Sequence, residues 1–488
     1  EKFKSLLLVV LIATSVVLTQ RVWFRSPLQM ISSEASYLFE KEDQLLITRQ
    51  QIIRPEKIII GFGGGADNSH YTFLPPSETD RFWQEMKMIL TDHFLGAPAV
   101  QEDPLDPEQQ AMIEQLEALG YLSGTVSALA GAVGATVYER DKTVQGLNFY
   151  TSGHFPGALL MDMEGNVLHR WQRGYRDIWS EEDKPGNAPG MEHWRRAFVY
   201  PNGDVLAIFE GSGIIKVDKD SNVIWANELR AHHDLEVMPN GDIYVLSREA
   251  HVVPRINPYQ PVLEDFVSVL APDGREKRRV SLLECLENSP YHHILARAKK
   301  RGDLFHTNSL RVLDDAIEAC LPAFRSGRIL TSFLVMNTVA VVDLDTKSAV
   351  WAWSGSFRRQ HDPKILPSGT MLIFDNRGGR PHSRVLEVDP ATRKTVWSYK
   401  GTAEAPFYSA SCGSAERLRN GNTLIVESDA GRVLEVTSAG RIVWEYRSPH
   451  RAGDDNSLVA TLFDLARLDP DYFDGEFTAG LSLPQQLE

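Results

Sequence analysis

Two histidines hold equivalent places in two copies of one sequence pattern. His361 comes eight residues before Gly369, and His233 comes eight residues before Gly241. In both copies the glycine is followed by a short apolar run, which is typical of a tight turn leading into a buried strand. An imidazole can act as a nucleophile, a proton carrier or a metal ligand near neutral pH. The repetition therefore predicts that these two side chains converge on one site.

Three further residues join this pattern. Counting eight residues back from the turn glycine of two other copies leads to Arg195 and Gly413. In a fifth copy an insertion precedes the turn, and the candidate there is His306, with Asn308 two residues further and so on the same face of an extended strand. The same alternation predicts that His232 faces away from His233. We expect a ring of three histidines, an asparagine and an arginine at one end of a channel.

Two kinds of chemistry suit such a ring. Neutral imidazoles are common metal ligands, but the spacing of the three histidines matches no metal motif, and we expect neither a metal nor a cofactor. In the alternative, one imidazole attacks the substrate while the others and Asn308 donate hydrogen bonds to the transferred group. A single buried histidine is more often structural, so the repetition is what favours a site.

The elements that must position these residues are repeated strands. One phrase, a turn feeding a strand, begins at Tyr200, Met238, Arg325, Leu366 and Leu418. A second phrase, a turn followed by a strand with a tryptophan, ends at Trp171, Trp225, Trp353, Trp397 and Trp444. The last three tryptophans are about 45 residues apart, the period of a four-stranded propeller blade.

Five copies are clear, and a degenerate sixth begins at Phe266. We therefore predict an all-β fold, a six-bladed β-propeller, over residues 141–450. Residues 451–488 are expected to form a C-terminal closing segment.

The N-terminal part has a different character. Residues 5–19 are uncharged and largely apolar, with Lys2 and Lys4 before them. This run predicts a transmembrane signal anchor over residues 1–21, which would make the protein a single-pass protein of the bacterial inner membrane with its propeller on the periplasmic side. A removable signal peptide or a buried helix are the alternatives.

Residues 22–140 predict a helical neck or small domain. Helical patterns occupy residues 33–51, 79–94 and 107–121, and Gly- and Pro-rich breaks separate them. Residues 58–68 are rich in glycine, but no Gly-Lys-Ser/Thr follows, so we interpret them as a turn and not as a phosphate loop. Residues 126–135 are interpreted as a linker.

Composition excludes some partners. The 488 residues carry a formal net charge of -14, which argues against a general nucleic-acid-binding protein. The three cysteines lack the spacing of a metal site.

The chain resembles the bacterial arylsulfate sulfotransferase family in four stretches, AHHDLEVMPNGD, LFHTNSLRVL, RRQHDPKILPSGTMLIFDNRGG and SAERLRNGNTLIVESDAGRVLEVTSAGRIVWEY. The resemblance covers residues 144–446 and implies a six-bladed propeller. It also implies transfer of a sulfuryl group from a phenolic sulfate to a phenol, without a nucleotide sulfate donor, through a sulfohistidine. By this resemblance His361 is the nucleophile, and His233, His306 and Asn308 surround the sulfuryl oxygens.

One departure from the family leaves the function open. Family members usually carry an arginine in the strand after the His-x-Asn segment, whereas this strand reads TSFLV from Thr331. Candidate replacements are Arg195, Arg358, Arg359 and Arg377. The residues expected to bind substrate are Arg195, Arg359, Asn376 and Arg377.

Three hypotheses follow. The first is a membrane-anchored sulfotransferase that uses a phenolic sulfate donor and a phenol acceptor. The second is a non-catalytic propeller that serves as a binding or assembly subunit of a membrane protein complex, with its anchor packed against partner helices. The third is a metal-dependent hydrolase or lyase.

Overall fold

A computed structural model describes residues 59–62, 70–73, 107–117, 119, 122–128, 131–179, 189–314, 321–377 and 382–481. The chain divides into two units, residues 1–105 and 106–488, which we describe separately. In the first, strands β1 (Ile59–Phe62) and β2 (His70–Phe73) pair antiparallel on either side of the expected glycine turn. The predicted anchor over residues 1–21 and the helical patterns at 33–51 and 79–94 lie outside the described residues. Among the residues that the structure describes, no helix is both long and apolar enough to cross a membrane.

The second unit consists mainly of antiparallel sheets. Within the described residues, six of its sheets have four or five strands. The first sheet contains β31 (Leu462–Leu468), β5 (Leu147–Ser152), β6 (Gly157–Met161) and β7 (Val167–Gln172). The second contains β8 (Arg196–Val199), β9 (Val205–Phe209), β10 (Gly213–Val217) and β11 (Val223–Asn227). The third contains β12 (Ala231–Val237), β13 (Ile243–His251), β14 (Val262–Leu270), β15 (Glu276–Ser281) and the short β16 (Gly302–Asp303).

The remaining sheets follow the same order. The fourth contains β17 (Thr307–Val312), β18 (Ile329–Phe333), β19 (Thr338–Asp343) and β20 (Ser348–Ser354). The fifth contains β21 (His361–Ile365), β22 (Met371–Asp375), β23 (Arg384–Asp389) and β24 (Lys394–Tyr399). The sixth contains β25 (Ser414–Arg417), β26 (Thr423–Glu427), β27 (Arg432–Val436), β28 (Ile442–Arg447) and β4 (Gly134–Tyr138).

Smaller elements complete this unit. A three-stranded sheet contains β29 (Arg451–Ala452), β30 (Leu458–Val459) and β3 (Val126–Ser127). The α-helices are α4 (Pro107–Glu117), α5 (Leu282–Glu287) and α6 (Gly475–Ala479). Short 3-10 turns occupy Arg140–Lys142, Tyr175–Asp177, Pro189–Met191, His292–Arg297, Pro322–Phe324 and Ser428–Ala430.

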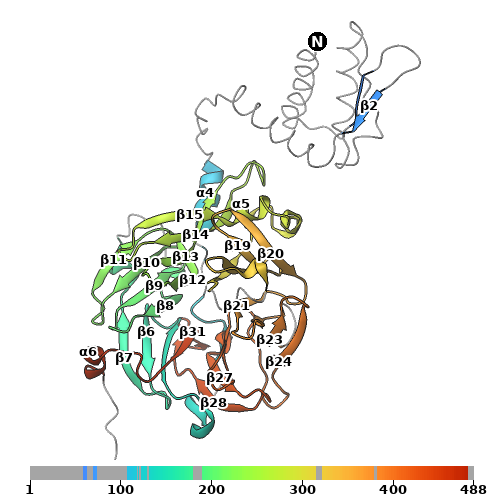
Figure 1. The fold of residues 1–488 in the computed structure, drawn as a ribbon. Helices are drawn as coiled ribbons and strands as arrows, with labels where there is room; N and C mark the ends of the chain where they lie inside the picture. Colours follow the sequence, from blue (N-terminus) through green and yellow to red (C-terminus); the bar gives the residue numbers. More distant parts are fainter. Residues whose placement is uncertain are drawn as a thin grey trace, which may run out of the picture. The chain divides into compact units, whose positions relative to one another are not determined.

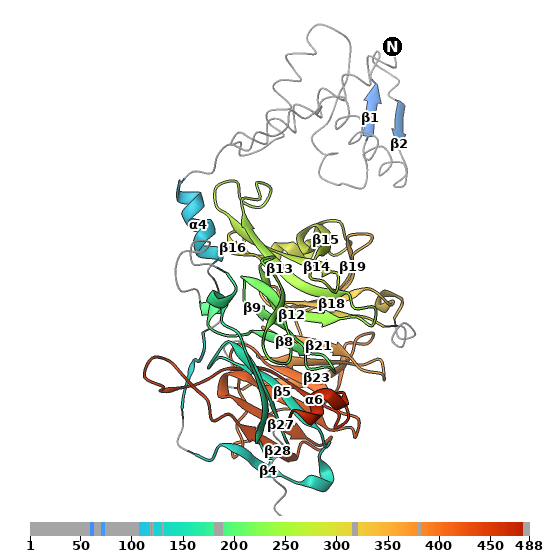
Figure 2. The ribbon, with the colours of Figure 1, turned by 90° about the vertical axis from the view of Figure 1, so that its left-hand side faces the viewer.

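The sheets follow one another around a common centre in a propeller-like arrangement (Figure 1). The first strands of successive sheets contact one another, from β8 to β12, β17, β21 and β25. Figures 1 and 2 both show β8, β12 and β21 near the middle of this arrangement, and β11 and β24 lie towards its rim in Figure 1. Because their first strands meet at the centre, equivalent residues of different sheets can approach one another there.

The hydrophobic core lies between neighbouring sheets. Second strands such as β9 (VLAIF) and β22 (MLIFD) are buried along their whole length, as expected for continuous apolar runs covered on both faces. Apolar clusters fill the spaces between successive sheets, including the space between the sixth sheet and the first. The indole Nε1 of Trp171 donates to Gly203 O, and that of Trp444 donates to Met163 O, each in a turn of the next sheet. These tryptophans are therefore packing residues that join neighbouring sheets.

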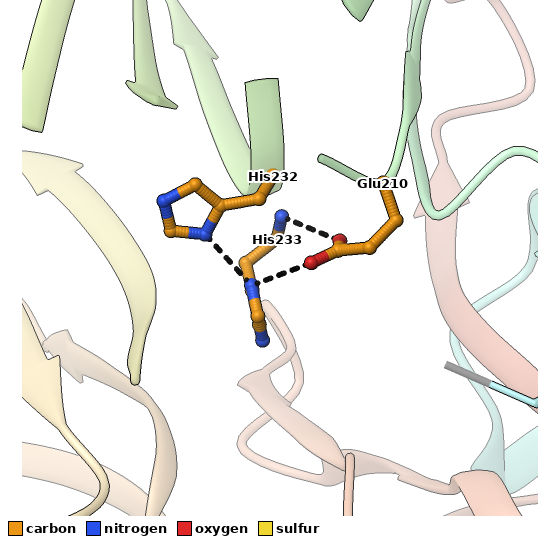
Figure 3. A group of neighbouring side chains, drawn as sticks. All are labelled: Glu210, His232 and His233. Carbon is orange, nitrogen blue, oxygen red and sulfur yellow. Dashed lines mark hydrogen bonds and ion pairs between the residues drawn. The ribbon is translucent and has the colours of Figure 1, made fainter. Parts of the chain in front are cut away.

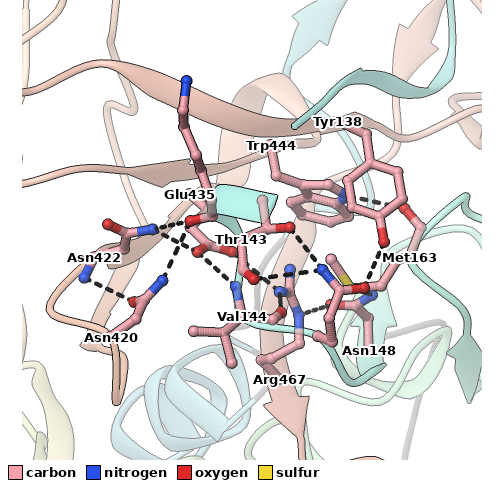
Figure 4. Close-up of polar contacts among 12 residues, drawn as sticks. Tyr138, Thr143, Val144, Asn148, Met163, Asn420, Asn422, Glu435, Trp444 and Arg467 are labelled. Atoms are coloured by element: carbon pink, nitrogen blue, oxygen red, sulfur yellow. Dashed lines mark hydrogen bonds and ion pairs between the residues drawn. The ribbon is translucent and has the colours of Figure 1, made fainter. Parts of the chain in front are cut away.

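A buried polar network joins the two ends of the ring (Figure 4). Strand β31 pairs with β5, so the C-terminal part of the chain supplies the innermost strand of the first sheet. Arg467 of β31 donates from Nε to Asn148 Oδ1 at 2.6 Å and lies 3.1 Å from Glu435 Oε2 of the sixth sheet. Glu435 Oε1 also accepts from Val144 N at 3.0 Å and Asn422 Nδ2 at 2.8 Å. We call Arg467, Glu435, Asn148 and Asn422 the closure network.

Three expectations about boundaries need correction. Residues 126–140, expected in a linker and helical neck, supply β3 and β4, and β4 pairs with β28 along the edge of the sixth sheet. The helix expected over residues 107–121 is described only for Pro107–Glu117. The copy that begins at Phe266 is not a separate unit, because β14 and β15 pair within the same sheet as β12 and β13.

Candidate functional site

Irregular strands position the three histidines. The pairing of β12 shifts register between Ala231 and Leu235, that of β17 between Thr307 and Leu310, and that of β21 after His361. His233 and His306 have positive φ angles of 54° and 51°, which few residues other than glycine adopt. Such strain is concentrated at functional sites. These bulges also change which side chains face the centre of the ring.

His233 and His306 meet across two sheets. Their Nε2 atoms lie 3.3 Å apart. Asp303 supports His306 from behind, with its Oδ1 2.9 Å from the backbone N and its Oδ2 2.5 Å from Nδ1 of His306. Burial alone would raise the pKa of Asp303, but the charge and hydrogen bonds of His306 lower it below its ordinary value. The ionised carboxylate therefore accepts the His306 Nδ1 proton, and His306 Nε2 carries a lone pair.

His361 has one ring nitrogen held and the other available. Its Nδ1 lies 2.8 Å from Asn376 Oδ1 and 3.0 Å from Arg359 O, which are both acceptors, so Nδ1 carries the proton. The opposite nitrogen, Nε2, is buried and has no hydrogen-bond partner among the described residues. Burial, together with the charges of Arg195, His233 and His306, lowers the pKa of His361 to about 3 despite the bond to Asn376. At neutral pH this imidazole is uncharged and its Nε2 lone pair is free to attack.

Asn376 fixes the orientation of His361. Its Nδ2 donates to Ser409 O and Cys412 O, both at 2.9 Å, and also contacts Ser411 O. Since the amide NH₂ is held by these carbonyls, Oδ1 must face the imidazole. The sequence predicted that Asn376 binds substrate, whereas the structure places it behind His361.

Arg195 is the buried cation of this site. It donates from Nη2 to Cys412 Sγ at 3.5 Å, and its guanidinium lies 5.1 Å from the centre of the Phe463 ring. Its charge lowers the pKa of His361 and of His233. Arg195 therefore lies close enough to interact electrostatically with both histidines.

The other candidate arginines lie elsewhere. Arg358 and Arg359 are exposed, and Arg377 contacts His382. The strand in which an arginine was expected, β18, contains none, and its Ser332 is hydrogen-bonded to Gln360. Among the arginines predicted from the sequence, Arg195 alone is described as both buried and next to His361.

Of the two polar side-chain atoms of Asn308, only the amide nitrogen has a described hydrogen bond. Its Nδ2 donates to Gln360 O at 2.9 Å, and its Oδ1 is buried without a hydrogen-bond partner among the described residues. Thr307 turns the other way, since its N and Oγ1 donate to Asp265 at 2.9 and 2.6 Å. No described contact joins Asn308 to the three histidines.

The sequence analysis missed two residues that contact His233 (Figure 3). Glu210 accepts from His233 N at 3.0 Å, and its other oxygen lies 3.2 Å from His233 Nδ1. His232 Nδ1 lies 2.8 Å from His233 Nδ1, so the prediction that His232 faces away is wrong. The bulge after Ala231 breaks the alternation on which that prediction rested. Glu210 comes seven residues after the turn glycine Gly203, as Asn376 comes seven residues after Gly369, and this shared position was the signal that could have identified it.

The same bonds determine the charges of these groups. Burial alone would raise the pKa of Glu210, but His233 and Arg248 hold it well below its ordinary value. Burial lowers the pKa of His233 to about 4. Burial and the neighbouring Asp303 raise the pKa of Asp265 to about 7, so Asp265 is mostly ionised at about pH 8.

A belt of alternating charges lies next to the histidines along the inner strands. Asp234 pairs with Arg196 at 3.1 Å and with Arg311 at 2.9 Å, and Asp362 pairs with Arg311 at 2.9 Å and Lys364 at 3.0 Å. Arg196 also contacts Asp464. A cavity of about 370 Å³ adjoins this charge belt and is lined by residues of β8, β17, β21, β25, β26 and β31. Its described lining includes Arg196, Arg311, Lys364 and Asp464 but none of the three histidines.

Comparisons with known proteins address the family. Residues 196–449, more than half of the chain, match the family model described as arylsulfotransferase (ASST). Residues 1–95 match the model of the N-terminal domain of YycH protein. No curated protein matches the chain.

Solved structures resemble the chain only distantly. A protein of unknown function from Bacteroides caccae is 10% identical, with 67% of this chain and 99% of that chain covered and a TM-score of 0.44. A streptogramin B lyase is 12% identical, with 71% and 97% covered and a TM-score of 0.37. The WD40 β-propeller domain of Doa1 is 13% identical, with 68% and 87% covered and a TM-score of 0.36. The family match confirms the resemblance found in the sequence, and the chain belongs to the arylsulfotransferase family.

Proposed function

We propose that this protein transfers a sulfuryl group from a phenolic sulfate ester to a phenol through a sulfohistidine at His361. The observation that carries the proposal is the state of the His361 ring. Asn376 and Arg359 O hold its Nδ1 proton, while its uncharged Nε2 is buried without a hydrogen-bond partner among the described residues. An imidazole held in one tautomer with an available lone pair is arranged to act as a nucleophile.

In the first half-reaction His361 Nε2 attacks sulfur and the bond from sulfur to the phenolic oxygen breaks. For this step His306 takes up a proton at Nε2 when the donor ester binds, in place of the hydrogen bond from His233, and gives that proton to the departing phenolate. Asp303 stabilises the charged form of His306 before the transfer. The sulfohistidine keeps its Nδ1 proton on Asn376 Oδ1. The second half-reaction reverses these steps with the incoming phenol, whose proton returns to His306. Two half-reactions of this kind imply ping-pong kinetics.

Charge on the sulfuryl oxygens is stabilised by Arg195 and by the Nε2 proton of His233. Donors aimed in advance at developing charge lower the barrier to reaction. Arg195 takes the part of the arginine that is missing from the strand with Ser332. Asn308 is kept in this proposal as a residue that orients the substrate, since its Oδ1 is buried and without a described partner.

The remaining expectations stay proposals. The six sheets with four or five strands are interpreted as six blades, because a hydrophobic cluster fills the space between each neighbouring pair. Residues 1–21 are proposed to anchor the protein in the bacterial inner membrane with the blades on the periplasmic side. Cell fractionation, with protease added to spheroplasts, tests this placement, and protein recovered only from the cytosol would contradict it.

The test of function uses 4-nitrophenyl sulfate as donor with an added phenol. We expect nitrophenolate release that depends on the phenol, is lost in His361→Ala and persists in His169→Ala, which removes an imidazole from the outer strand β7. Mass spectrometry of the enzyme quenched with donor alone should find a sulfuryl group on His361.

No release by folded wild-type protein with several donors and acceptors would contradict the proposal. That outcome would favour the non-catalytic subunit.

A further inference from the structure

Three possible ligand atoms converge beside the proposed nucleophile (Figure 3). Glu210, His232 and His233 each offer one atom, and these atoms all lie within 4.8 Å of one another. The two imidazole Nδ1 atoms are 2.8 Å apart, and His233 Nδ1 is 3.2 Å from Glu210 Oε1. All three side chains are almost completely buried.

The backbone explains how neighbouring histidines reach one point. In a regular strand, side chains at consecutive positions point to opposite faces. The bulge of β12 and the left-handed conformation of His233, with φ of 54°, turn both rings towards Glu210. A strained conformation of this kind in a buried strand indicates a functional requirement.

The hydrogen bonds around His306 fix the tautomer of His233. Asp303 accepts the Nδ1 proton of His306, so His306 Nε2 is an acceptor. The facing atom, His233 Nε2 at 3.3 Å, must then carry the proton of a neutral ring. His233 Nδ1 is left with a lone pair that points towards Glu210 and His232.

The carboxylate of Asp265 bears on which ring nitrogen of His232 carries the proton. Asp265 accepts two bonds from Thr307 through Oδ2 and lies 3.5 Å from His232 Nε2 through Oδ1. His232 Nε2 makes no hydrogen bond among the described residues, so Asp265 acts on it through its negative charge, which favours the proton on Nε2. His232 Nδ1 then also carries a lone pair, directed at His233 Nδ1.

We propose that Glu210, His232 and His233 form a binding site for a divalent transition metal, with Zn²⁺ as the best match. Two neutral imidazole nitrogens and a carboxylate oxygen directed at one point, with no proton between them, repel one another unless a cation is present. Two histidines and one carboxylate are a known ligand set for zinc, which leaves a further position open. Groups that face the opposite nitrogen of a ligating histidine help to orient its ring. Here these groups are His306 for His233 and the nearby Asp265 carboxylate for His232.

Two of the three distances between ligand atoms can be compared with a tetrahedral site, and the third, between His232 and Glu210, is within 4.8 Å. Tetrahedral ligands at about 2.0 Å from zinc lie about 3.3 Å from one another. The 3.2 Å contact already meets this spacing, and the 2.8 Å contact has to widen by about 0.5 Å. Arg248, whose Nη1 is 3.5 Å from Glu210 Oε1, opposes the cation by its charge.

A metal at this site would also define the role of His233. Metal bound at Nδ1 would keep the proton on Nε2, the atom that faces His306 and the nucleophile. The metal would orient His233 and contact no substrate. Binding itself does not depend on the proposed sulfuryl transfer, so the two can fail separately.

The test measures metal binding without any substrate. Full-length protein without a histidine tag is stripped with a chelator, transferred to buffer at about pH 8 and titrated with Co²⁺, whose visible absorption reports its ligands. We expect one metal per chain, displaced by Zn²⁺, with zinc–ligand distances near 2.0 Å in X-ray absorption. His361→Ala, a change in the same ring outside the ligand set, should bind as the wild type does.

Variants separate a metal site from a buried hydrogen-bonded cluster. His232→Ala and Glu210→Gln should lower metal affinity by at least about tenfold, and Asp303→Asn and Asp265→Asn by about 10- to 100-fold. The proposal is overturned if stripped wild-type protein binds no stoichiometric metal, or if folded His232→Ala and Glu210→Gln both bind it normally. The wild-type titration decides the question even if every variant fails to fold.

Discussion

Two groups of buried polar residues in this molecule differ in how their polar atoms are paired. One is the closure network, and the other is the histidine ring, which consists of Arg195, His233, His306, Asn308 and His361. In the closure network Arg467 and Glu435 are a charged pair in which each partner also binds a neighbouring strand. In the histidine ring, His361 Nε2 and Asn308 Oδ1 are buried without partners among the described residues. The closure network pairs its opposite charges within the protein, although Arg467 Nη2 is itself buried without a described partner. The histidine ring leaves the proposed nucleophilic nitrogen without one.

The backbone differs in the same sense. The histidines lie at bulges, and two of them have positive φ angles. Arg467 and Glu435 lie in paired stretches of β31 and β27. Since the pairing of β27 with β28 also shifts register next to Glu435, a bulge alone does not distinguish the two groups. The left-handed backbone of His233 and His306 does. The following predictions test this comparison, from the largest expected effect to the smallest.

Breaking the closure network should cost the most stability. Arg467→Met leaves Glu435 as an unpaired buried charge, so the free energy of unfolding should fall by about 3–5 kcal/mol. Adding Glu435→Gln should restore part of this loss, because no buried charge then remains. Urea unfolding of the single and double variants measures both effects. A double variant less stable than Arg467→Met would contradict the assigned pairing.

Replacing Arg195, the cation next to the histidines, should lower the rate of turnover and leave stability nearly unchanged. Arg195→Met should lower kcat by about 10²- to 10³-fold, the usual effect of losing a donor to developing charge. The pKa of His361 should rise from about 3, because Arg195 holds it down. Steady-state kinetics and NMR titration of the imidazole check the two effects. Unchanged kcat in the folded variant would remove Arg195 from the proposed mechanism.

Acid should destabilise the fold through His193, a buried histidine next to Arg195 of the histidine ring. Burial, with the charge of Arg195, lowers the pKa of His193 to about 4, and neither ring nitrogen has a described partner. Below about pH 6.5 the unfolded chain binds a proton that folded His193 refuses, so stability falls as the pH drops towards 4.

His193→Leu should remove up to about 2 kcal/mol of this loss at about pH 5. His293→Leu, at an exposed position, is the matched control and should keep the wild-type pH dependence. Urea unfolding between about pH 8 and pH 5 provides the measurement. Parallel curves for wild type and His193→Leu would show that His193 titrates as it does in the unfolded chain.

An exposed arginine should matter least. Arg359 binds His361 through its backbone carbonyl and its side chain is exposed, so Arg359→Ala should change kcat/KM by less than about twofold. A loss comparable to that of Arg195→Met would show that the Arg359 side chain reaches the substrate. Measuring both variants with one donor and acceptor pair makes them directly comparable.

Sequence repetition predicted the parts of this molecule that repeat. The turn phrases identified the strands, and the count from the turn glycines identified His233, His361 and Arg195, which lie close enough to interact electrostatically. Period-two alternation failed at His232, because a bulge cannot be recognised from the sequence of β12 alone. Glu210 was missed because it follows the second strand β9, and only the contact between the second and third sheets brings it to His233.

The ends of the ring were harder to predict for another reason. Strand β31 pairs with β5 more than 300 residues away, and β4 pairs with β28 at a similar separation. Neither strand carries a repeated phrase, because each completes a sheet begun elsewhere in the chain. Patterns of neighbouring residues alone therefore placed residues 126–140 in the linker and helical neck.

The late position of β31 sets the time at which the site can exist during synthesis. A nascent chain that has emerged through residue 450 carries all three histidines and Asn376, yet still lacks the strand on which Phe463 stacks with His193 and contacts Arg195. Until residues 462–468 leave the ribosome, the first sheet lacks its innermost strand. A stalled or truncated chain would thus carry the three histidines in an incomplete set of sheets. The proposed site can therefore form only when synthesis of the polypeptide is nearly finished.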